Sequence, residues 1–427
     1  MKAVLSNRIY LQVTPEQVEA LDQELTYKIK AYRQDLPPII IKNIGLVRPG
    51  IITLPSGRED LIPEGYEIVD KRILVPVDFP ERLTPLYPSQ EEIYEAVNSS
   101  CMINASVSWG KTFTALAIAG KLGQKTLVVT HTTNLRDQWV DEVKKMYKFR
   151  PGIIGSGQYN VSTPIVIGNV QSLYKKITEI SRMFGTIIVD ECHHVSSPTF
   201  TKIVDKSYAT YKIGLSGTLE RKDGRHIVFP DYFTSKVFKP TKENYMVPKV
   251  NVIKSEIRFM DGTAVPWAIK VNDLAFNEEY QRTVAMIATV YAKKGHKVLV
   301  VSDRVRFLKV CAELCGNDAI SVTGEASRAV RAQAARMINS GEKKILFGTQ
   351  SIFSEGVSIN ELSCLILGTP VNNTPLLTQL IGRILRISEG KLQPIIIDLH
   401  LKGSTASRQA NARLTHYLNE SYDIKVI

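Results

Sequence analysis

The sequence predicts an α/β protein with two successive parallel sheets and a small N-terminal α/β accessory domain. From about residue 90 onward, short apolar runs bounded by polar turns alternate with helical patterns. Continuous apolar strands separated by helices are typical of parallel sheets covered on both faces. The alternation pauses between about residues 230 and 270, where the chain is basic and aromatic, and then resumes. The pause predicts a boundary between two sheets.

The first eighty or so residues follow a different pattern. A threonine cap, a proline and a closing glutamine at positions 14–17 predict a helix start, and Pro37 with Pro38 prevents its continuation. The β-rich runs 39–41 and 51–54 and the turn 55–58 favour a small mixed module. We therefore expect an accessory domain at 1–80, one sheet domain at 81–240 and a second at 241–427.

Composition narrows the class of protein. With 427 residues, 44% hydrophobic and 22% charged, the chain is expected to be globular. Its 54 Lys and Arg exceed its 42 Asp and Glu, a net charge of +12 that favours a polyanionic partner, although solubility alone would also explain it. No run approaches the roughly 20 apolar residues of a membrane span, so we expect no membrane partner and a cytoplasmic location. Five cysteines without a CxxC pair argue against a zinc site or a disulfide framework.

A phosphate-binding loop is predicted at 105–112, between the apolar run 101–104 and an apolar helix. Backbone N–H groups of Ser108, Trp109 and Gly110 would cradle the phosphates at the helix N-terminus. Lys111 would reach the β- and γ-phosphates, and Thr112 would place its hydroxyl on Mg²⁺. The motif implies ATP and Mg²⁺ as cofactors, although a lone Gly-Lys-Thr also occurs by chance.

The acidic pair Asp190 and Glu191 follows the apolar run 187–189. A strand that ends in two carboxylates presents them at the sheet edge where ligands bind in open α/β sheets. Asp190 would hold the metal through its water shell, and Glu191 would orient and deprotonate the attacking water. The phosphate loop or the acidic pair alone could be an ordinary structural feature. Because both are present and in this order, their chance occurrence is improbable.

The run 190–193, Asp-Glu-Cys-His, resembles the DExH box of superfamily 2 helicases, and further segments between about 82 and 400 resemble the family's motifs in order. The resemblance implies two tandem RecA-like domains and ATP hydrolysis coupled to movement on nucleic acid. Gln90 resembles the glutamine that reads adenine. Segments 130–135 and 168–173 resemble motifs that face the nucleic-acid backbone, which implies strand contacts from Thr130, His131, Thr132, Asn169, Gln171 and Ser172. Ser216 and Thr218 resemble the motif that links the two sites, and His193 is a further expected coupler.

One departure concerns the phosphate loop. The family pattern A-x-x-G-x-G-K-T has a glycine where this chain has Ser108, with Trp109 beside it. Serine tolerates positive φ poorly, so we expect a slightly reshaped loop. Because backbone atoms make the phosphate contacts, we expect ATP binding to be retained.

The second half carries the remaining resemblances. Segments 302–304, 323–324 and 348–357 imply strand contacts from Ser302, Arg304, Thr323 and Thr349, and nucleotide contacts from Glu355 and Gly356. Gln379, Arg383 and Arg386 resemble the motif that supplies the arginine finger. Their spacing of four and three residues predicts that they share one helical face. The alternative to an arginine finger is that this face is simply exposed to solvent.

The small N-terminal module and the DECHH box resemble phage-encoded branch-migration helicases of the UvsW type and, more distantly, RecG and XPB. This implies a monomeric motor on DNA forks, D-loops or Holliday junctions in recombination, replication or repair. A DExH RNA helicase and a non-hydrolysing nucleic-acid clamp are the alternatives. The module either binds duplex DNA through the 55–58 turn or braces the first motor domain. Trp267 and Tyr280 are expected in the core rather than in a strand-separating element.

Overall fold

The computed structural model describes residues 1–29, 37–106, 108–194, 197–217, 219, 224–241, 243, 245–262, 264–350, 359–371 and 373–427. The chain divides into two compact units. The first comprises Met1–Ser106 and Gly110–Glu243, and the second comprises Val107–Trp109 and Asn244–Ile427.

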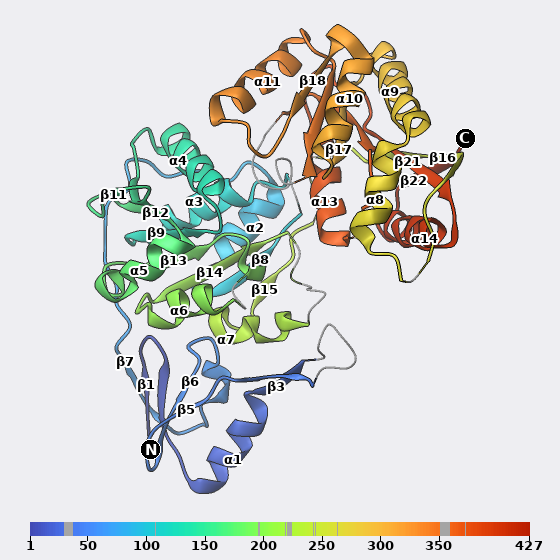
Figure 1. Ribbon diagram of the computed structural model, residues 1–427. Helices are drawn as coiled ribbons and strands as arrows, with labels where there is room; N and C mark the ends of the chain where they lie inside the picture. The colour runs from blue at the N-terminus through green and yellow to red at the C-terminus, as the bar shows by residue number, and fades with distance from the viewer. Residues whose placement is uncertain are drawn as a thin grey trace. The chain divides into compact units, whose positions relative to one another are not determined.

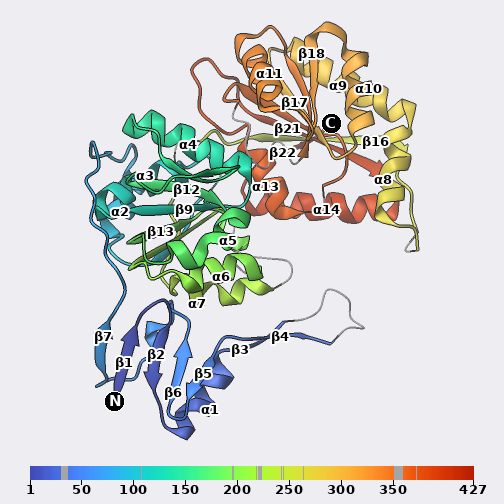
Figure 2. The same ribbon diagram turned by 60° about the vertical axis from the view of Figure 1, so that its left-hand side comes forward.

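The N-terminal module of the first unit is a five-stranded sheet of order β5-β6-β2-β1-β7 with one helix. Its elements are β1 (Lys2–Leu5), β2 (Ile9–Gln12), α1 (Pro15–Glu24), β5 (Gly45–Arg48), β6 (Ile51–Leu54), a 3₁₀ turn (Glu59–Leu61) and β7 (Glu67–Asp70). The predicted capping box is present, because Thr14 Oγ1 accepts from Gln17 N and the Gln17 side chain accepts from Thr14 N. The strands β3 (Thr26–Ile29) and β4 (Ile39–Lys42) form a separate ribbon that extends from the small sheet (Figure 2).

An eight-stranded sheet of order β11-β10-β12-β9-β13-β14-β8-β15 forms the rest of this unit, and β10–β11 is its antiparallel pair. Helices lie on both faces of the sheet (Figure 1). The strands are β8 (Cys101–Asn104), β9 (Thr126–Thr130), β10 (Gly152–Gly155), β11 (Gln158–Tyr159), β12 (Ile165–Asn169), β13 (Thr186–Val189), β14 (Tyr211–Ser216) and β15 (Val237–Phe238). The helices are α2 (Pro88–Ala96), α3 (Lys111–Leu122), α4 (Thr133–Tyr147), α5 (Val170–Ile180), α6 (Pro198–Lys206) and α7 (Phe229–Phe233), with 3₁₀ turns at Cys192–His194 and Arg225–Val228.

The second unit contains a seven-stranded parallel sheet of order β18-β19-β17-β20-β21-β16-β22. Its strands are β16 (Lys249–Arg258), β17 (Lys297–Ser302), β18 (Ala319–Val322), β19 (Ile345–Thr349), β20 (Leu362–Leu367), β21 (Ile395–Lys402) and β22 (Asp423–Val426). Its described helices are α8 (Trp267–Phe276), α9 (Glu278–Lys293), α10 (Val305–Cys315), α11 (Arg328–Ser340), α13 (Thr374–Gly382) and α14 (Ser404–Asn419), with a 3₁₀ turn at Gly316–Asp318.

The continuous apolar runs are central strands, as predicted. Every residue of β9, β13, β19 and β20 is buried, because helices cover both faces of each parallel sheet. The predicted α/β class with parallel sheets and a small N-terminal α/β module is confirmed. Tyr280 is buried as expected, and its hydroxyl donates to Gly368 O. The expectation for Trp267 is wrong, because 40% of this residue is exposed at the start of α8.

The turn at 55–58 packs against the first motor domain. Gly57 N donates to Asp231 O at 2.9 Å, and a Cβ on Gly57 would lie 2.1 Å from Pro230 O. Arg58 lies 3.5 Å from the fully buried carboxylate of Asp231, and Lys212 Nζ donates to Ser56 Oγ. Of the two roles considered for this turn, its contacts favour bracing.

A second set of contacts joins the module to α6. Arg8 pairs with the Asp205 carboxylate at 3.1 Å, and Asn7 Nδ2 donates to Asp205 O. The segment that follows the module is also held, since Val77 N donates to Gly123 O and Lys125 N donates to Val75 O. The module and the eight-stranded sheet are therefore joined by polar contacts as well as by the chain.

Candidate nucleotide and nucleic-acid sites

The phosphate loop lies between β8 and α3, as predicted. Ser108 has φ 72° and Gly110 has φ 97°, so Ser108 adopts the left-handed conformation for which glycine is favoured. Lys111 Nζ donates to Ala105 O and Ser106 O. Trp109 is buried. Thr112 stands in the first turn of α3, beside Lys111.

Gln90 lies against this loop. A Cβ on Gly110 would be 2.5 Å from Gln90 Nε2, and the positive φ of Gly110 also favours glycine there. Gln90 is buried on α2, and its Oε1 accepts from Leu86 N at 3.1 Å. The structure thus brings together two residues that lie twenty positions apart in the predicted nucleotide site.

The first carboxylate of the acidic pair is buried at the end of β13. Asp190 Oδ2 accepts from Trp139 Nε1 at 2.8 Å, and Oδ1 accepts from Glu191 N at 3.0 Å. Burial raises the pKa of Asp190, and the neighbouring Glu191 carboxylate raises it further. Sequence reasoning missed Trp139, although it lies one turn beyond Leu135 on α4, the helix that begins within the 130–135 segment.

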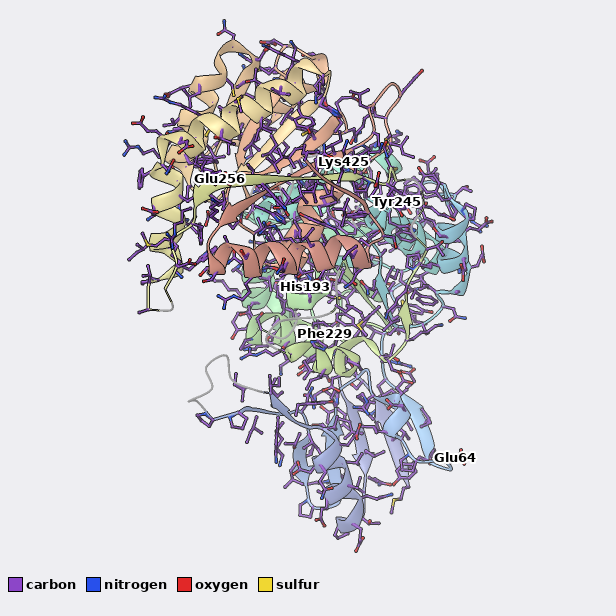
Figure 3. The ribbon with its side chains drawn as sticks, turned by 90° about the vertical axis from the view of Figure 1, so that its right-hand side faces the viewer. Glu64, His193, Phe229, Tyr245, Glu256 and Lys425 are labelled. Carbon is purple, nitrogen blue, oxygen red and sulfur yellow. The ribbon has the colours of Figure 1, made fainter. Side chains whose placement is uncertain are left out.

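The second carboxylate is part of a chain of side chains. His193 Nδ1 lies 3.2 Å from Glu191 Oε2 and 3.0 Å from Ser216 Oγ at the end of β14. Glu191 has φ 49°, a left-handed backbone that costs a non-glycine residue on the order of 1–3 kcal/mol. Figure 3 labels His193 in the segment after β13. The predicted coupler Thr218 lies outside the described residues.

The residues of the first sheet that are predicted to contact a nucleic-acid strand fall into two groups. Thr130 is fully buried, and its hydroxyl donates to Thr132 O and Gly168 O. Its side chain therefore positions the loop that follows β9 and does not contact nucleic acid. Thr132 caps α4 by accepting from Leu135 N, and the half-buried His131 ring stacks on Phe200 at 5.9 Å.

The other group surrounds Gly155 at the end of β10. A Cβ there would lie 2.8 Å from Ser172 Oγ, 2.9 Å from Asn169 Oδ1 and 3.2 Å from Arg136 Nη1. Gln171 is exposed, and its Oε1 accepts from Asn169 Nδ2. Arg136 was missed by sequence reasoning, although it directly follows the 130–135 segment. These side chains form a polar cluster at the carboxyl edge of the sheet.

In the second unit, Ser302 is also internal. Its Oγ accepts from Arg304 N and from Thr369 Oγ1, both at 3.1 Å, which corrects its expected strand contact to a positioning role. Arg304 pairs with Asp303 at 2.7 Å and stays partly exposed. Thr349 is buried at the end of β19, and Thr323 is half-buried after β18. Glu355 and Gly356 lie outside the described residues.

The predicted shared helical face of Gln379, Arg383 and Arg386 is wrong in part. Helix α13 ends at Gly382, Arg383 caps it with helical φ and ψ, and Arg386 lies beyond it. The chain leaves the helix because Arg386 forms an antiparallel bridge with Tyr245, and Met246 N donates to Leu385 O. Gln379 and Arg383 remain one helical turn apart, and Arg386 donates to Asn360 Oδ1.

Known proteins carry the same organisation. A family model described as "Type III restriction enzyme, res subunit" matches residues 83–221, and "Helicase conserved C-terminal domain" matches 280–388. The chain is 42% identical to "Probable helicase D10" of Escherichia phage T5 over 432 residues, covering 99% of this chain and 95% of the relative. This chain belongs to the superfamily 2 helicases. Accordingly, it is an ATP-dependent helicase with the two RecA-like domains of that family.

Two further similarities are more distant. "ATP-dependent DNA helicase uvsW" of Enterobacteria phage T4 is 23% identical over 376 residues, 81% of this chain and 74% of the relative. The structure of S. cerevisiae Dbp5 bound to RNA and ADP BeF3 superposes with a TM-score of 0.56 at 11% identity, covering 80% of this chain and 89% of that one. The second likeness shows a shared fold. None of the helices in the described part of the chain is long and apolar enough to cross a membrane.

Proposed function

We propose that this superfamily 2 helicase is a DNA motor that unwinds or branch-migrates forked and four-way junction DNA. The observation that carries the proposal is the chain of contacts from Glu191 through His193 to Ser216, which joins the acidic pair to the end of the neighbouring strand β14. In a motor, hydrolysis must respond to the nucleic acid. A carboxylate whose position depends on a histidine that also contacts the next strand provides a physical link for that response.

The nucleotide chemistry is assigned to the first sheet. Lys111 neutralises the β- and γ-phosphates, and backbone N–H groups of 108–110 at the α3 N-terminus hold them. Glu191 orients the attacking water and accepts its proton. Arg383 and Arg386 act as the arginine finger, Gln379 helps to position it, and Gln90 reads the adenine.

The residues present suit Mg²⁺. The buried Asp190 carboxylate is oriented by two donors and keeps free lone pairs, and Thr112 offers a hydroxyl. No group of three or more His, Cys, Asp or Glu in the described ranges is arranged to hold a metal by itself. Mg²⁺ commonly takes one or two protein oxygens together with water and substrate phosphates, so this sparse set fits it. When bound, the ion would neutralise charge on the phosphates.

The binding site for the nucleic-acid strand is assigned to the carboxyl edges of both sheets. Asn169, Gln171, Ser172 and His131 at the first, with Arg304, Thr323 and Thr349 at the second, are proposed to contact phosphates and sugars. Such contacts are independent of base sequence and weaken as salt rises. DNA is preferred over RNA because the phage T4 relative is named a DNA helicase. We place the protein, as a monomer, in the cytoplasm where recombination, replication and repair of DNA occur.

The test is steady-state ATP hydrolysis with no nucleic acid, single-stranded DNA, linear duplex, a four-way junction and single-stranded RNA. The proposal expects the junction to stimulate hydrolysis most. Equal or greater stimulation by RNA would replace the DNA assignment with the RNA helicase alternative. Hydrolysis that no nucleic acid changes would remove the coupling on which the proposal rests.

A further inference from the structure

A pocket of about 240 Å³ opens at the carboxyl edge of the seven-stranded sheet. Helix α8 supplies Trp267 and Val271, and the N-terminal end of α13 supplies Asn373 and Leu376. Two further lining residues, Asp303 and Gln350, directly follow β17 and β19. The lining thus combines aromatic and aliphatic side chains with polar ones.

The indole of Trp267 is fixed with much of its surface in solvent. Its ring packs against the buried ring of Phe259, with centroids 5.5 Å apart. Phe259 N donates to Lys402 O at 2.8 Å, which ties this segment to the sheet. Of the three tryptophans, Trp109 and Trp139 are buried, whereas 40% of Trp267 is exposed. A rigid aromatic ring with an accessible face is what a nucleobase needs for stacking.

The segment between Phe259 and α8 has a second anchor. Asp261 accepts from the backbone N of Ser404 and Thr405 at the start of α14, at 3.1 and 2.9 Å. These donors, led by the Thr405 backbone, lower the pKa of Asp261 to about 2. The carboxylate therefore stays ionised at neutral pH and the anchor stays formed. The backbone at Asp261 is thereby tied to the start of α14.

The polar lining residues suit a base better than a phosphate. The Asp303 carboxylate repels phosphate oxygens but can accept from the exocyclic amine of a base. The amides of Gln350 and Asn373 offer both donors and acceptors, although Asn373 Oδ1 already accepts from Leu376 N. Arg304 pairs with Asp303 at 2.7 Å and so places a guanidinium next to the pocket. This cation could attract the phosphate backbone of the nucleic acid.

The pocket also lies next to the residues assigned to the strand. Asp303 directly precedes Arg304, and Gln350 directly follows Thr349. We propose that this pocket binds one nucleobase of the tracked strand, stacked on Trp267. The inference rests on the proposed function and deepens it, because the motor would then grip the strand by a base as well as by its phosphates.

The test uses the full chain and two fluorescent DNA strands of equal length, one of oligo-thymidine and one composed of abasic nucleotides. Wild-type protein should bind the thymidine strand about 5- to 140-fold more tightly, the range that one stacked base contributes. Trp267→Ala should lose this preference by weakening the thymidine complex alone. Trp267→Phe, which keeps an aromatic face, should retain most of it. Met286→Ala, an exposed substitution on α9, serves as the control and should change neither affinity.

Several outcomes would overturn the inference. Equal losses for both strands in Trp267→Ala would indicate a structural role for the ring, and unchanged preference in Trp267→Ala would place the stacked base elsewhere. The proposed function has its own readout. If wild-type hydrolysis is stimulated by DNA but the two strands bind equally, only the pocket assignment fails. If wild-type protein binds neither strand and no nucleic acid stimulates hydrolysis, both fail.

Discussion

The carboxyl edges of the two large sheets hold their polar residues in different ways. At the first, Asp190 is buried against Trp139, Glu191 contacts His193, and both Ser108 and Glu191 have positive φ. At the second, Ser302 is held internally while the Trp267 pocket stays open. Within the described part of 244–427, the one non-glycine residue with positive φ is Ser421, which precedes β22 and so lies at the other edge of that sheet.

This difference separates two tasks. Strained backbone and buried hydrogen bonds persist where surrounding structure fixes a reactive geometry, and each strained residue costs on the order of 1–3 kcal/mol. An open pocket with rotatable amides suits a ligand that must bind and leave repeatedly. We infer that the first edge is built for hydrolysis and the second for holding a moving strand.

The largest effect on ATP hydrolysis is expected from a residue of the second unit, although hydrolysis is assigned to the first sheet. Arg383→Ala, in the second unit, should lower kcat for ATP hydrolysis by about 10³-fold or more with little change in ATP affinity, because a finger acts on the transition state. Arg383→Lys should recover part of the activity, since it keeps the charge but loses the planar fork. Arg282→Ala, an exposed change on α9, is the control. Wild-type turnover in Arg383→Ala would remove this residue as the finger.

Glu191→Gln tests the first edge directly. Removing the general base should lower hydrolysis by about 10²–10⁴-fold while ATP still binds. Pre-steady-state hydrolysis and nucleotide binding would be measured side by side, with the exposed Glu179→Gln as the matched control. Turnover close to wild type would show that Glu191 is not the base.

His193→Ala should separate basal ATP hydrolysis from its stimulation by DNA. Because His193 contacts both Glu191 and Ser216, its loss should reduce DNA stimulation of hydrolysis by roughly tenfold, a coupling of about 1–3 kcal/mol. Ser216→Ala should act in the same direction. The ratio of rates with and without DNA is the readout, and an equal fall in both rates would argue for a general structural role.

The smallest effect is expected from Ser108→Gly. Relieving the positive φ should offset the loss of the hydrogen bonds between Ser108 Oγ and both Gly382 O and Arg386 Nε, so stability should change by less than about 1 kcal/mol. ATP affinity should change by less than about threefold, since backbone atoms hold the phosphates. Lys148→Gly, at the left-handed C-cap of α4, is the matched control for stability. Thermal unfolding and nucleotide binding would check both. A large loss of ATP affinity in Ser108→Gly would contradict the expectation that only the backbone of this position serves the nucleotide.

Local patterns of the sequence predicted much of this structure. The capping box at Thr14, the strand 101–104 and the buried runs of both sheets are encoded by residues close together in the chain. The loop and the acidic pair were found because their spacing is fixed by the chemistry they serve.

Contacts between distant residues could not be predicted in the same way. Trp139 reaches Asp190 across 51 positions, and Arg58 meets Asp231 across 173, so no local pattern reports them. The end of α13 was misjudged because helical spacing continues to Arg386, whereas a bridge to Tyr245 draws the chain out of the helix. Trp267 was misplaced because a large aromatic residue is usually core.

The most direct test of the central claim is ATP-driven branch migration of a synthetic four-way junction, comparing wild-type protein with Lys111→Ala. We expect wild-type protein to convert the junction to two duplexes only when ATP and Mg²⁺ are present, and Lys111→Ala to bind the junction without converting it. Conversion that proceeds without ATP, or a wild-type protein that hydrolyses ATP on the junction yet never moves the branch, would contradict it.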